Sequence, residues 1–315
     1  MPHSAPAHKS FADRNSLYQQ ITDKIIAELE QGRVPWVQPW ANVRAPLGLP
    51  KNAATGRAYS GVNVLILWVA CAERAFGTQR WLTYRQALKL GGHVGKGEKG
   101  TTLVYADRFI PYRERMRAEA TGDAPEAIPF LKSFTVFNSD QCADLPAELA
   151  PAPAAPDKDL ILPQAEALIR ATGADIRFGG NRAFYVPSAD YIQMPPRSAF
   201  FEPAGFYQVL LHEASHWAGA EHRLHRDLSG TFGSPSYCRE ELCAELSGCF
   251  LCAALSIVPA VRHADYLGHF LDVLREDNRA IIKAASAASK TADYLLAFRG
   301  AAADPEIPGE IPAAA

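Results

Sequence analysis

The sequence predicts an α+β protein of two domains, and three observations support this prediction. The chain has 315 residues, of which 48% are hydrophobic, so it is long enough for two domains of ordinary globular composition. An Ala/Pro-rich segment at residues 145–159, LPAELAPAPAAPDKD, is typical of a linker. Helical periodicity and short β-type runs occur on both sides of it. We therefore expect domains at 15–144 and 160–300, a disordered leader at 1–14 and a disordered tail at 301–315.

Charge is distributed unevenly along the chain. Residues 1–110 contain 14 Lys and Arg against 7 Asp and Glu, a net of +7, and the whole chain carries −2, so the remainder carries −9. A basic front domain favours nucleic acid as a partner. The apolar runs are too short to span a bilayer, and the first 16 residues lack the apolar core of a secretory signal. We expect a cytoplasmic protein without a membrane partner.

In the front domain, apolar spacing predicts a helix over 16–32, with Ser16 as its N-cap. Two more helices are expected, a buried one within 59–77 and a short one at 83–92. Strands are predicted at the end of 92–109 and over 130–142, with a charged excursion from Tyr112 to Glu126 between them.

In the back domain, a helix at 162–173 precedes a meander of short strands over 174–195. Further helices are expected around residues 211–224, from about Arg239 to Ser256, and near 262–283 and 285–298. The chain has six cysteines, and four of them fall in one of these helical stretches. At that spacing we expect small buried side chains rather than a disulfide framework.

Residues 211–224, LHEASHWAGAEHRL, contain the zinc-hydrolase pattern H-E-x-x-H. On a helix, His212 and His216 lie four residues apart and can direct their imidazoles at one metal ion. Glu213 lies beside them, where its carboxylate can take a proton from a water molecule at the ion. The alternative is a pair of histidines with no metal between them.

A catalytic metal site needs a third protein ligand. The stretch also fits H-E-x-x-H-x-x-G-x-x-H, in which His222 is that ligand, but such sites rest on a methionine downstream, and here none follows the motif. Glu241 is the better candidate, because it borders an apolar helix face where a carboxylate needs a cation or a histidine. Glu245 is then expected to accept a hydrogen bond from a ligand histidine. Glu240 is the second choice of ligand, and a solvated charged edge is the alternative.

The remaining expectations for this site concern the ion and the substrate. Two histidines and a glutamate suit Zn²⁺ best, while Mn²⁺ or Co²⁺ would also fit. The predicted strand Tyr191–Met194, just before the motif, is expected to pair with an extended peptide if the site cleaves an unidentified protein substrate.

The basic half also contains four of the five tryptophans. Single-stranded nucleic acid is held by cationic side chains together with aromatic faces on which bases stack. Trp36 and Trp40 are expected to be exposed stacking residues, whereas Trp68 is expected in the core. The candidate phosphate contacts are Arg33, Arg57, Arg80, Arg85, Lys96 and Lys99. The Gly/Lys-rich stretch that holds the two lysines lacks the spacing of a nucleotide-binding P-loop.

These motifs together resemble the ArdC-type antirestriction proteins of plasmids and other mobile elements. The front match runs through YQQITDKIIAELEQGRVPWVQPW, GLPKNAATGRAYSGVNVLIL and FTVFNSDQ. The back match runs through ADYIQMP, LLHEASHWAGAEHRLHRD, YCREELCAELSGCFLCAALSI and NRAIIKAASAASKTADYLL. The resemblance spans nearly all of residues 15–298. One departure is Ala220, because the family commonly has histidine at that position.

The resemblance implies a single-stranded-DNA-binding domain followed by a zincin-like metallopeptidase domain. It supports His212, His216 and Glu241 as metal ligands with Glu213 as the catalytic carboxylate. We expect DNA binding without sequence specificity, with single strands as the main partner and duplex as a second candidate. Two alternatives stay open. One is an active metallopeptidase localised by DNA, and the other is a non-enzymatic DNA-binding protein whose structural ion takes His222 or His225 as an extra ligand.

Overall fold

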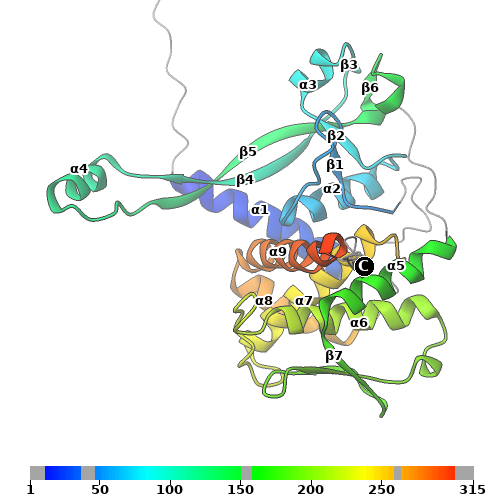
Figure 1. Cartoon of the computed structure of the whole chain (residues 1–315). Coiled ribbons are helices and arrows are strands. Elements are labelled where there is room, and N and C mark those ends of the chain that lie inside the picture. The colour runs from blue at the N-terminus through cyan, green and yellow to red at the C-terminus, as the bar shows by residue number, and fades with distance from the viewer. Residues whose placement is uncertain (1–10, 37–46, 150–157, 259–263, 302–315) are drawn as a thin grey trace, which may run out of the picture. The chain divides into compact units, whose positions relative to one another are not determined.

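The structure is a computed structural model that describes residues 11–36, 47–149, 158–258 and 264–301 (Figure 1). Contacts divide the chain into two compact units. Unit 1 combines Met1–Ala154 with His263–Ser286, and unit 2 combines Ala155–Arg262 with Ala287–Ala315. Residues 263–286, which the linear division at residue 160 assigns to the back domain, thus pack with the front one. The predicted two-domain, mixed helix and strand fold is confirmed.

Unit 1 is built around a four-stranded sheet in the order β1-β2-β5-β4, in which β1 and β2 run parallel and the other pairs are antiparallel. A two-stranded sheet pairs β3 with β6. The strands are β1 (Lys51–Asn52), β2 (Arg80–Leu82), β3 (His93–Val94), β4 (Thr101–Phe109), β5 (Ile128–Asn138) and β6 (Cys142–Ala143). The helices are α1 (Phe11–Glu30), α2 (Val62–Glu73), α3 (Tyr84–Lys89), α4 (Tyr112–Thr121) and α8 (Ala264–Glu276), with short 3₁₀ turns η2 (Ser139–Gln141) and η3 (Ala147–Leu149).

The core of unit 1 forms where the apolar helix α2 packs on the sheet. Leu65, Leu67 and Trp68 of α2 are fully buried, as are Trp81 of β2 and Leu103 of β4. The predicted core position of Trp68 is therefore confirmed. Figure 1 shows β4 and β5 continuing beyond this core as a long hairpin with α4 at its tip.

Unit 2 carries a three-stranded sheet in the order β7-β9-β8. Its strands are β7 (Asp175–Phe178), β8 (Phe184–Val186) and β9 (Tyr191–Met194). Its helices are α5 (Lys158–Thr172), α6 (Pro203–Ala218), α7 (Pro235–Ala254) and the part of α9 (Ala280–Ala301) that follows Ser286, with a 3₁₀ turn η4 (Arg197–Ala199). The antiparallel helices α6 and α7 pack side by side, and their facing leucines form the core.

Four sequence predictions need correction. The first helix begins at Phe11 rather than after Ser16, because no Pro or Gly in residues 11–15 stops it. The charged excursion after Tyr112 contains the helix α4. The last two helices are divided at Asp277–Arg279, where the Asp277 carboxylate accepts from the Arg279 amide at 2.9 Å, and not near residue 284. The fourth concerns β9, which is the central strand: all four of its residues pair with β7, and the first three also pair with β8. It therefore has no free edge for a peptide.

Other predictions fall partly or wholly outside the described residues. Residues 1–10 of the leader predicted at 1–14, residues 150–157 of the linker predicted at 145–159, residues 302–315 of the tail predicted at 301–315, and Trp40 lie outside the described residues. All six cysteines are free thiols, and the four predicted to be small buried residues of one helix are buried in α7. No helix within the described part of the chain is long and apolar enough to cross a membrane.

Candidate functional site

The candidate metal centre lies between α6 and α7. Helix α6 starts with Pro203 at its first turn, and α7 starts at Ser234, whose hydroxyl accepts from the Tyr237 amide at 3.2 Å. Gly248 of α7 lies against the His212 backbone, so the two helices approach closely there. This packing turns the histidine face of α6 towards the acidic edge of α7.

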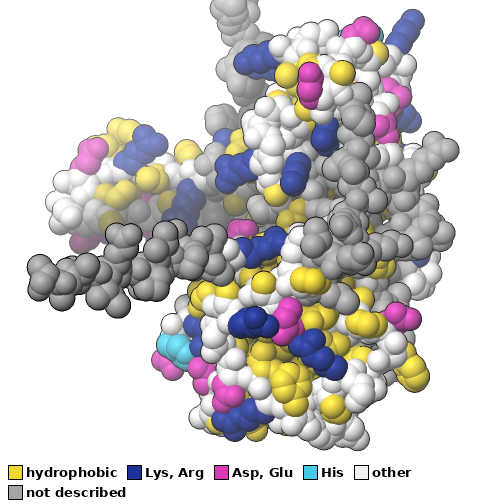
Figure 2. Space-filling model, turned by 45° about the vertical axis from the view of Figure 1, so that its right-hand side comes forward, with side chains coloured by type: hydrophobic (Ala, Val, Ile, Leu, Met, Phe, Trp, Pro, Cys, Tyr) yellow, Lys and Arg dark blue, Asp and Glu magenta, His cyan; other side chains and the backbone are white. Residues whose placement is uncertain are grey.

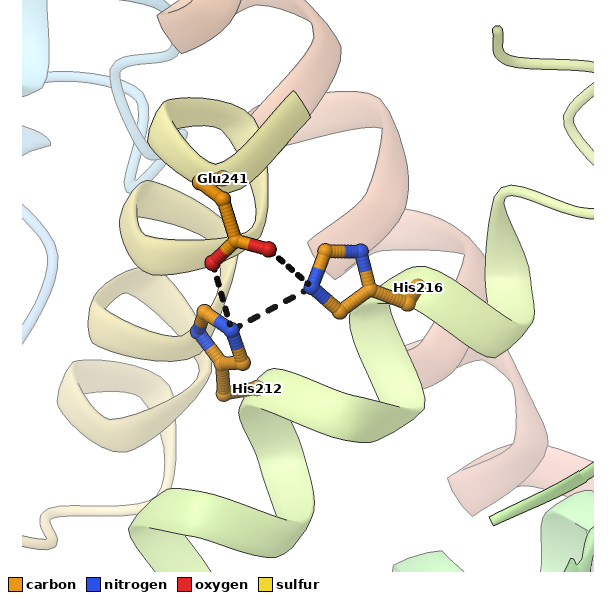
Figure 3. A group of neighbouring side chains, drawn as sticks. All are labelled: His212, His216 and Glu241. Carbon is orange, nitrogen blue, oxygen red and sulfur yellow. Dashed lines mark hydrogen bonds and ion pairs between the residues drawn. The ribbon is translucent and has the colours of Figure 1, made fainter. Parts of the chain in front are cut away.

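Three predicted ligands converge at this point (Figure 3). The Nε2 atoms of His212 and His216 lie 3.2 Å apart. Glu241 Oε2 lies 3.5 Å from His212 Nε2, and Glu241 Oε1 lies 3.6 Å from His216 Nε2. Ligand atoms around a tetrahedral ion with bonds of about 2.1 Å are separated by about 3.4 Å. The two imidazoles and the carboxylate therefore fit a divalent metal ion.

Outside this triad, each histidine faces a second glutamate through its other ring nitrogen. His216 Nδ1 lies 3.1 Å from Glu240 Oε1, and His212 Nδ1 lies 3.5 Å from Glu245 Oε2. A carboxylate at this position fixes the tautomer and orientation of a ligand histidine. Glu245 stands where a hydrogen-bond acceptor was predicted, whereas Glu240, the second choice of ligand, faces the outer nitrogen of His216 instead of the shared point.

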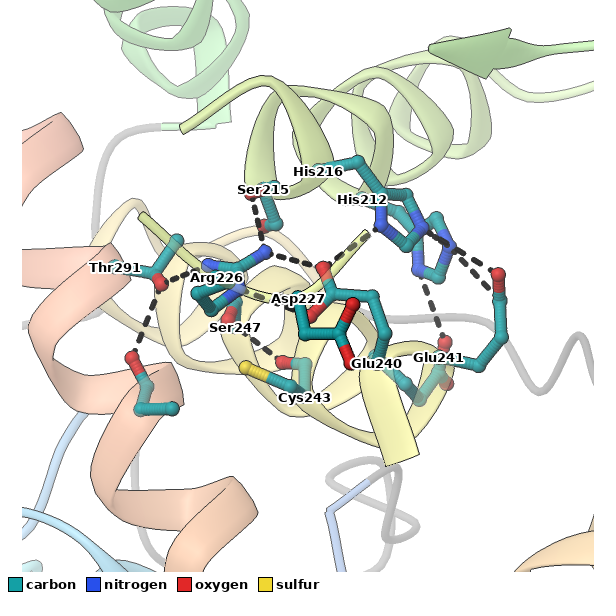
Figure 4. A network of polar contacts seen from close by, with 12 residues as sticks. His212, Ser215, His216, Arg226, Asp227, Glu240, Glu241, Cys243, Ser247 and Thr291 are labelled. Atoms are coloured by element: carbon teal, nitrogen blue, oxygen red, sulfur yellow. Dashed lines mark hydrogen bonds and ion pairs between the residues drawn. The ribbon is translucent and has the colours of Figure 1, made fainter. Parts of the chain in front are cut away.

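Glu240 is itself held by a network that the sequence did not predict (Figure 4). Arg226 donates to both carboxylate oxygens of Glu240, at 3.0 and 2.6 Å. The same guanidinium donates to the Ser215 carbonyl at 2.7 Å and to the Thr291 hydroxyl at 2.6 Å. Since Arg226 comes from the loop between α6 and α7, its path is not encoded by helical spacing.

The hydrogen bonds of Arg226 also explain why Gly219 occupies the glycine position of the pattern H-E-x-x-H-x-x-G-x-x-H. Gly219 has φ −73° and ψ −12°, a conformation open to any residue. A Cβ atom at Gly219 would lie 2.8 Å from Arg226 Nη2. A residue with a side chain at this position would therefore clash with the guanidinium. The glycine is thus accounted for without a turn that returns His222 to the metal.

His222 belongs to a different cluster. Its Nε2 atom lies 3.4 Å from Asp190 Oδ2 and accepts from Arg223 Nη1 at 2.6 Å, and its side chain is 62% exposed. Arg223 also donates to Asp190 and stacks over Trp217 at 3.8 Å from the ring centre. Among the described residues, the group of side chains close enough to share an ion is His212, His216 and Glu241.

The electrostatics of the metal centre favour an ionised carboxylate. Burial favours the neutral form of Glu241, but its hydrogen bond with His212 and the nearby histidine charges outweigh burial and lower its pKa to about 2. Burial opposes the charged form of His212, yet hydrogen bonds to Glu241 and Glu245 raise its pKa well above the usual range. Glu213 is buried one residue further along α6 and adds to this effect through its charge.

In unit 1, the structure separates the predicted DNA contacts into groups. The expectation that Trp36 is exposed is wrong, because its ring is 1% exposed and packs edge-on against Phe270 of α8 at 6.2 Å. Arg33 forms a two-point ion pair with Glu28, at 2.7 and 2.6 Å. Arg80 donates to the Glu148 carbonyl at 2.7 Å. Arg33 is exposed as well, but it is held in its ion pair with Glu28; the exposed candidates outside an ion pair among the described residues are Arg57, Arg85, Lys96 and Lys99.

Unit 2 presents apolar side chains to solvent. Figure 2 shows hydrophobic side chains gathered over the lower part of the view, with acidic and basic ones among them. The exposed large side chains of this unit are Phe178, Phe184, Phe201, Phe232 and Val258. A gathering of apolar side chains such as the one in Figure 2 is typical of binding surfaces.

The fold and the ligand geometry define a two-domain protein whose second domain is zincin-like. The family model described as zincin-like metallopeptidase matches residues 163–287. The model described as the N-terminal domain of anti-restriction factor ArdC matches residues 15–137.

Solved structures and sequence relatives agree with these matches. The metal-free crystal structure of the antirestriction protein ArdC from plasmid R388 is 41% identical, with a TM-score of 0.75 over 90% of this chain and 98% of that one. Its Mn(II)-bound form is 40% identical, with a TM-score of 0.73 over 91% and 98%. The chain belongs to the ArdC family of antirestriction proteins.

Two further relatives have other descriptions. The uncharacterized protein y4eC of Sinorhizobium fredii is 39% identical over 93% of this chain and 95% of its own length. DNA primase TraC of Escherichia coli is 34% identical over 90% of this chain, which corresponds to only 20% of TraC. The same kind of two-domain segment therefore also occurs inside a much longer protein.

Proposed function

We propose that this ArdC-like antirestriction protein binds single-stranded DNA without sequence specificity through unit 1 and holds one divalent metal ion in unit 2. The observation that supports the second part is the convergence of His212, His216 and Glu241 at ligand distances. Zn²⁺ is the metal that this donor set suits best, and Mn²⁺ and Co²⁺ are the alternatives. The Mn(II)-bound R388 protein supports a divalent ion.

The proposal for unit 1 rests on its basic charge and on the family match. Phosphates attract exposed Lys and Arg, and the exposed candidates Arg57, Arg85, Lys96 and Lys99 lie in this unit. Nothing in the described elements places a helix as a reader of the major groove, so we propose binding to the backbone and bases of single strands. Duplex DNA is the second candidate partner.

The second candidate function is peptide hydrolysis, and the buried carboxylate of Glu213 favours it. Glu213 is not needed to hold the ion, but a carboxylate beside the ion is needed to move a proton. When bound, the ion supplies Lewis-acid activation of water and of a peptide carbonyl. Glu213 accepts a proton from the attacking water and passes it to the leaving amine. The apolar side chains exposed on unit 2 supply contacts for an unidentified protein substrate.

The test measures metal content, single-stranded DNA affinity and protection of incoming DNA from restriction in parallel, on the wild type and Glu213→Ala. We expect the wild type to bind the ion and the DNA, and we expect DNA affinity to fall with added salt. If Glu213→Ala keeps both ligands but loses protection, the peptidase function is supported. If protection survives, the protein protects DNA without proteolysis. A wild type that binds no single-stranded DNA would contradict the proposal for unit 1.

A further inference from the structure

Unit 1 needs an aromatic surface other than its tryptophans if it is to stack bases. Trp36, Trp68 and Trp81, the tryptophans of this unit that the structure describes, are all buried. Base stacking requires a ring face open to solvent. A stacking surface among the described residues must therefore be built from a tyrosine or a phenylalanine.

The short helix α3 exposes such a ring. Tyr84 is its first residue and is 53% exposed, with Leu88 one turn later and also exposed. Ala87, in the same short helix, is fully buried, so α3 packs against the rest of unit 1 at this residue. Because residues four apart share a face, Tyr84 and Leu88 form an apolar stripe on the solvent side of α3.

Basic residues border this stripe. Arg85 and Lys89 lie on the same exposed half of α3, displaced by one residue from Tyr84 and Leu88. Gln86 exchanges side-chain hydrogen bonds with Asn52 at 3.1 and 3.3 Å, which joins α3 to the turn after β1. Arg57 lies in that turn, where its carbonyl accepts from the Asn52 amide at 2.8 Å.

The stretch of sequence that contains α3 is rich in positive charge. Residues 47–97 contain seven Lys and Arg and a single acidic residue, Glu73. Glu73 is already paired with Lys24, at 3.1 Å. Within the described part of the chain, Arg57, Arg85 and Lys89 form no ion pair with a carboxylate. Several exposed cations outside ion pairs suit a polyanion.

Helix α4 provides an internal comparison, because it also begins with Tyr-Arg. Tyr112 is 73% exposed, more than Tyr84. Residues 107–126 contain four basic residues against five acidic ones, and Arg117 is paired with Glu114 and Asp123. Exposure of a ring is thus common to both helices, whereas an excess of positive charge is found only around α3.

We propose that Tyr84 stacks on a base of single-stranded DNA while Arg57, Arg85 and Lys89 contact the adjoining phosphates. This inference rests on the proposed DNA binding of unit 1 and assigns its aromatic contact to α3. A stacked base contributes an affinity of about 5- to 140-fold. Each phosphate contact contributes about 0.7 to the slope of log affinity against log salt for a single strand.

The experiment measures the affinity of the full chain for a labelled mixed-sequence single strand, with a duplex of the same sequence in parallel. Tyr84→Ala is expected to weaken single-strand binding by about 5- to 140-fold. Tyr84→Phe should bind like the wild type, because the ring face and not the hydroxyl makes the contact. The matched variant Tyr112→Ala should also bind like the wild type. Arg85→Ala should lower the salt slope by about 0.7.

Several results would overturn the assignment. Tyr84→Ala could bind single strands with wild-type affinity, or it could lose as much affinity for duplex DNA as for single strands. Tyr112→Ala could also lose more single-strand affinity than Tyr84→Ala. An unchanged melting temperature in Tyr84→Ala shows that a loss of affinity is not a loss of fold. If the wild type binds single strands and Tyr84→Ala does too, only this inference fails. If the wild type binds none, the proposed function fails first.

Discussion

The metal centre of unit 2 and the basic surface of unit 1 differ in what holds their side chains in place. His216 is oriented by Glu240, and Glu240 is oriented in turn by Arg226, through hydrogen bonds of 2.6 to 3.1 Å between partly buried groups. Arg57 and Arg85 project into solvent. A change at the metal centre should therefore disturb several neighbours, whereas changes on the basic surface should be small, additive and sensitive to salt.

The largest effect is expected from removing the carboxylate ligand. Glu241→Ala should lower metal affinity by more than about 100-fold, because loss of even an outer hydrogen-bond partner costs 10- to 100-fold. Metal content after dialysis against a defined metal buffer measures it. His222→Ala is the control and should keep the ion. If His222→Ala loses the ion and Glu241→Ala keeps it, the ligand set proposed here is incorrect.

A smaller effect should follow from Glu240→Gln, which keeps the shape of the side chain but removes its charge. Without the charge, His216 faces a neutral amide in place of the carboxylate at 3.1 Å, and Arg226 loses its ion pair. We expect metal affinity to fall by about 10- to 100-fold, measured by competition with a metal indicator. Glu245→Gln is the matched variant and should cost less, because its contact with His212 is longer at 3.5 Å. A larger loss in Glu245→Gln would reverse this ranking.

Metal affinity should also depend on pH. Below its raised pKa, His212 holds a proton that must leave before the nitrogen can bind an ion. Affinity should therefore fall by about tenfold for each pH unit below that pKa and level off above it. Glu241, with a pKa of about 2, stays ionised over this range and adds no further dependence. Calorimetry in buffers of different ionisation enthalpy counts the released proton. No proton release at neutral pH would contradict the direction of the His212 shift.

The same contrast explains which features the sequence could predict. The convergence of His212, His216 and Glu241 was expected because helical spacing sets the first two, and because a carboxylate at the border of an apolar face needs a partner. The role of Glu240 was not expected, because its partner Arg226 comes from a loop that no periodic pattern describes. Loop paths depend on tertiary contacts, which a single sequence does not display.

The errors in unit 1 have a related cause. Trp36 follows a helix and lies in a basic stretch bounded by prolines. The composition of that stretch is equally compatible with an exposed and with a buried ring. What buries it is Phe270 of α8, more than 200 residues away in the chain. Local patterns placed α8 with the back domain, so that contact could not be anticipated. The exposure of Tyr84 and the burial of Trp36 were likewise beyond composition, which counts aromatic residues but does not orient them.

The smallest expected effect concerns the two lysines in the turn between β3 and β4. Lys96→Ala/Lys99→Ala should lower the slope of log affinity against log salt by about 1.4 if both side chains contact phosphates of a single strand. Binding at low salt should weaken only modestly, because Arg57, Arg85 and Lys89 remain. The measurement is a salt titration of single-stranded DNA affinity, with Lys283→Ala, which removes a lysine paired with Asp277, as the control. A slope equal to that of the wild type would place the DNA away from this turn, and the basic surface would then be confined to α3 and the turn after β1.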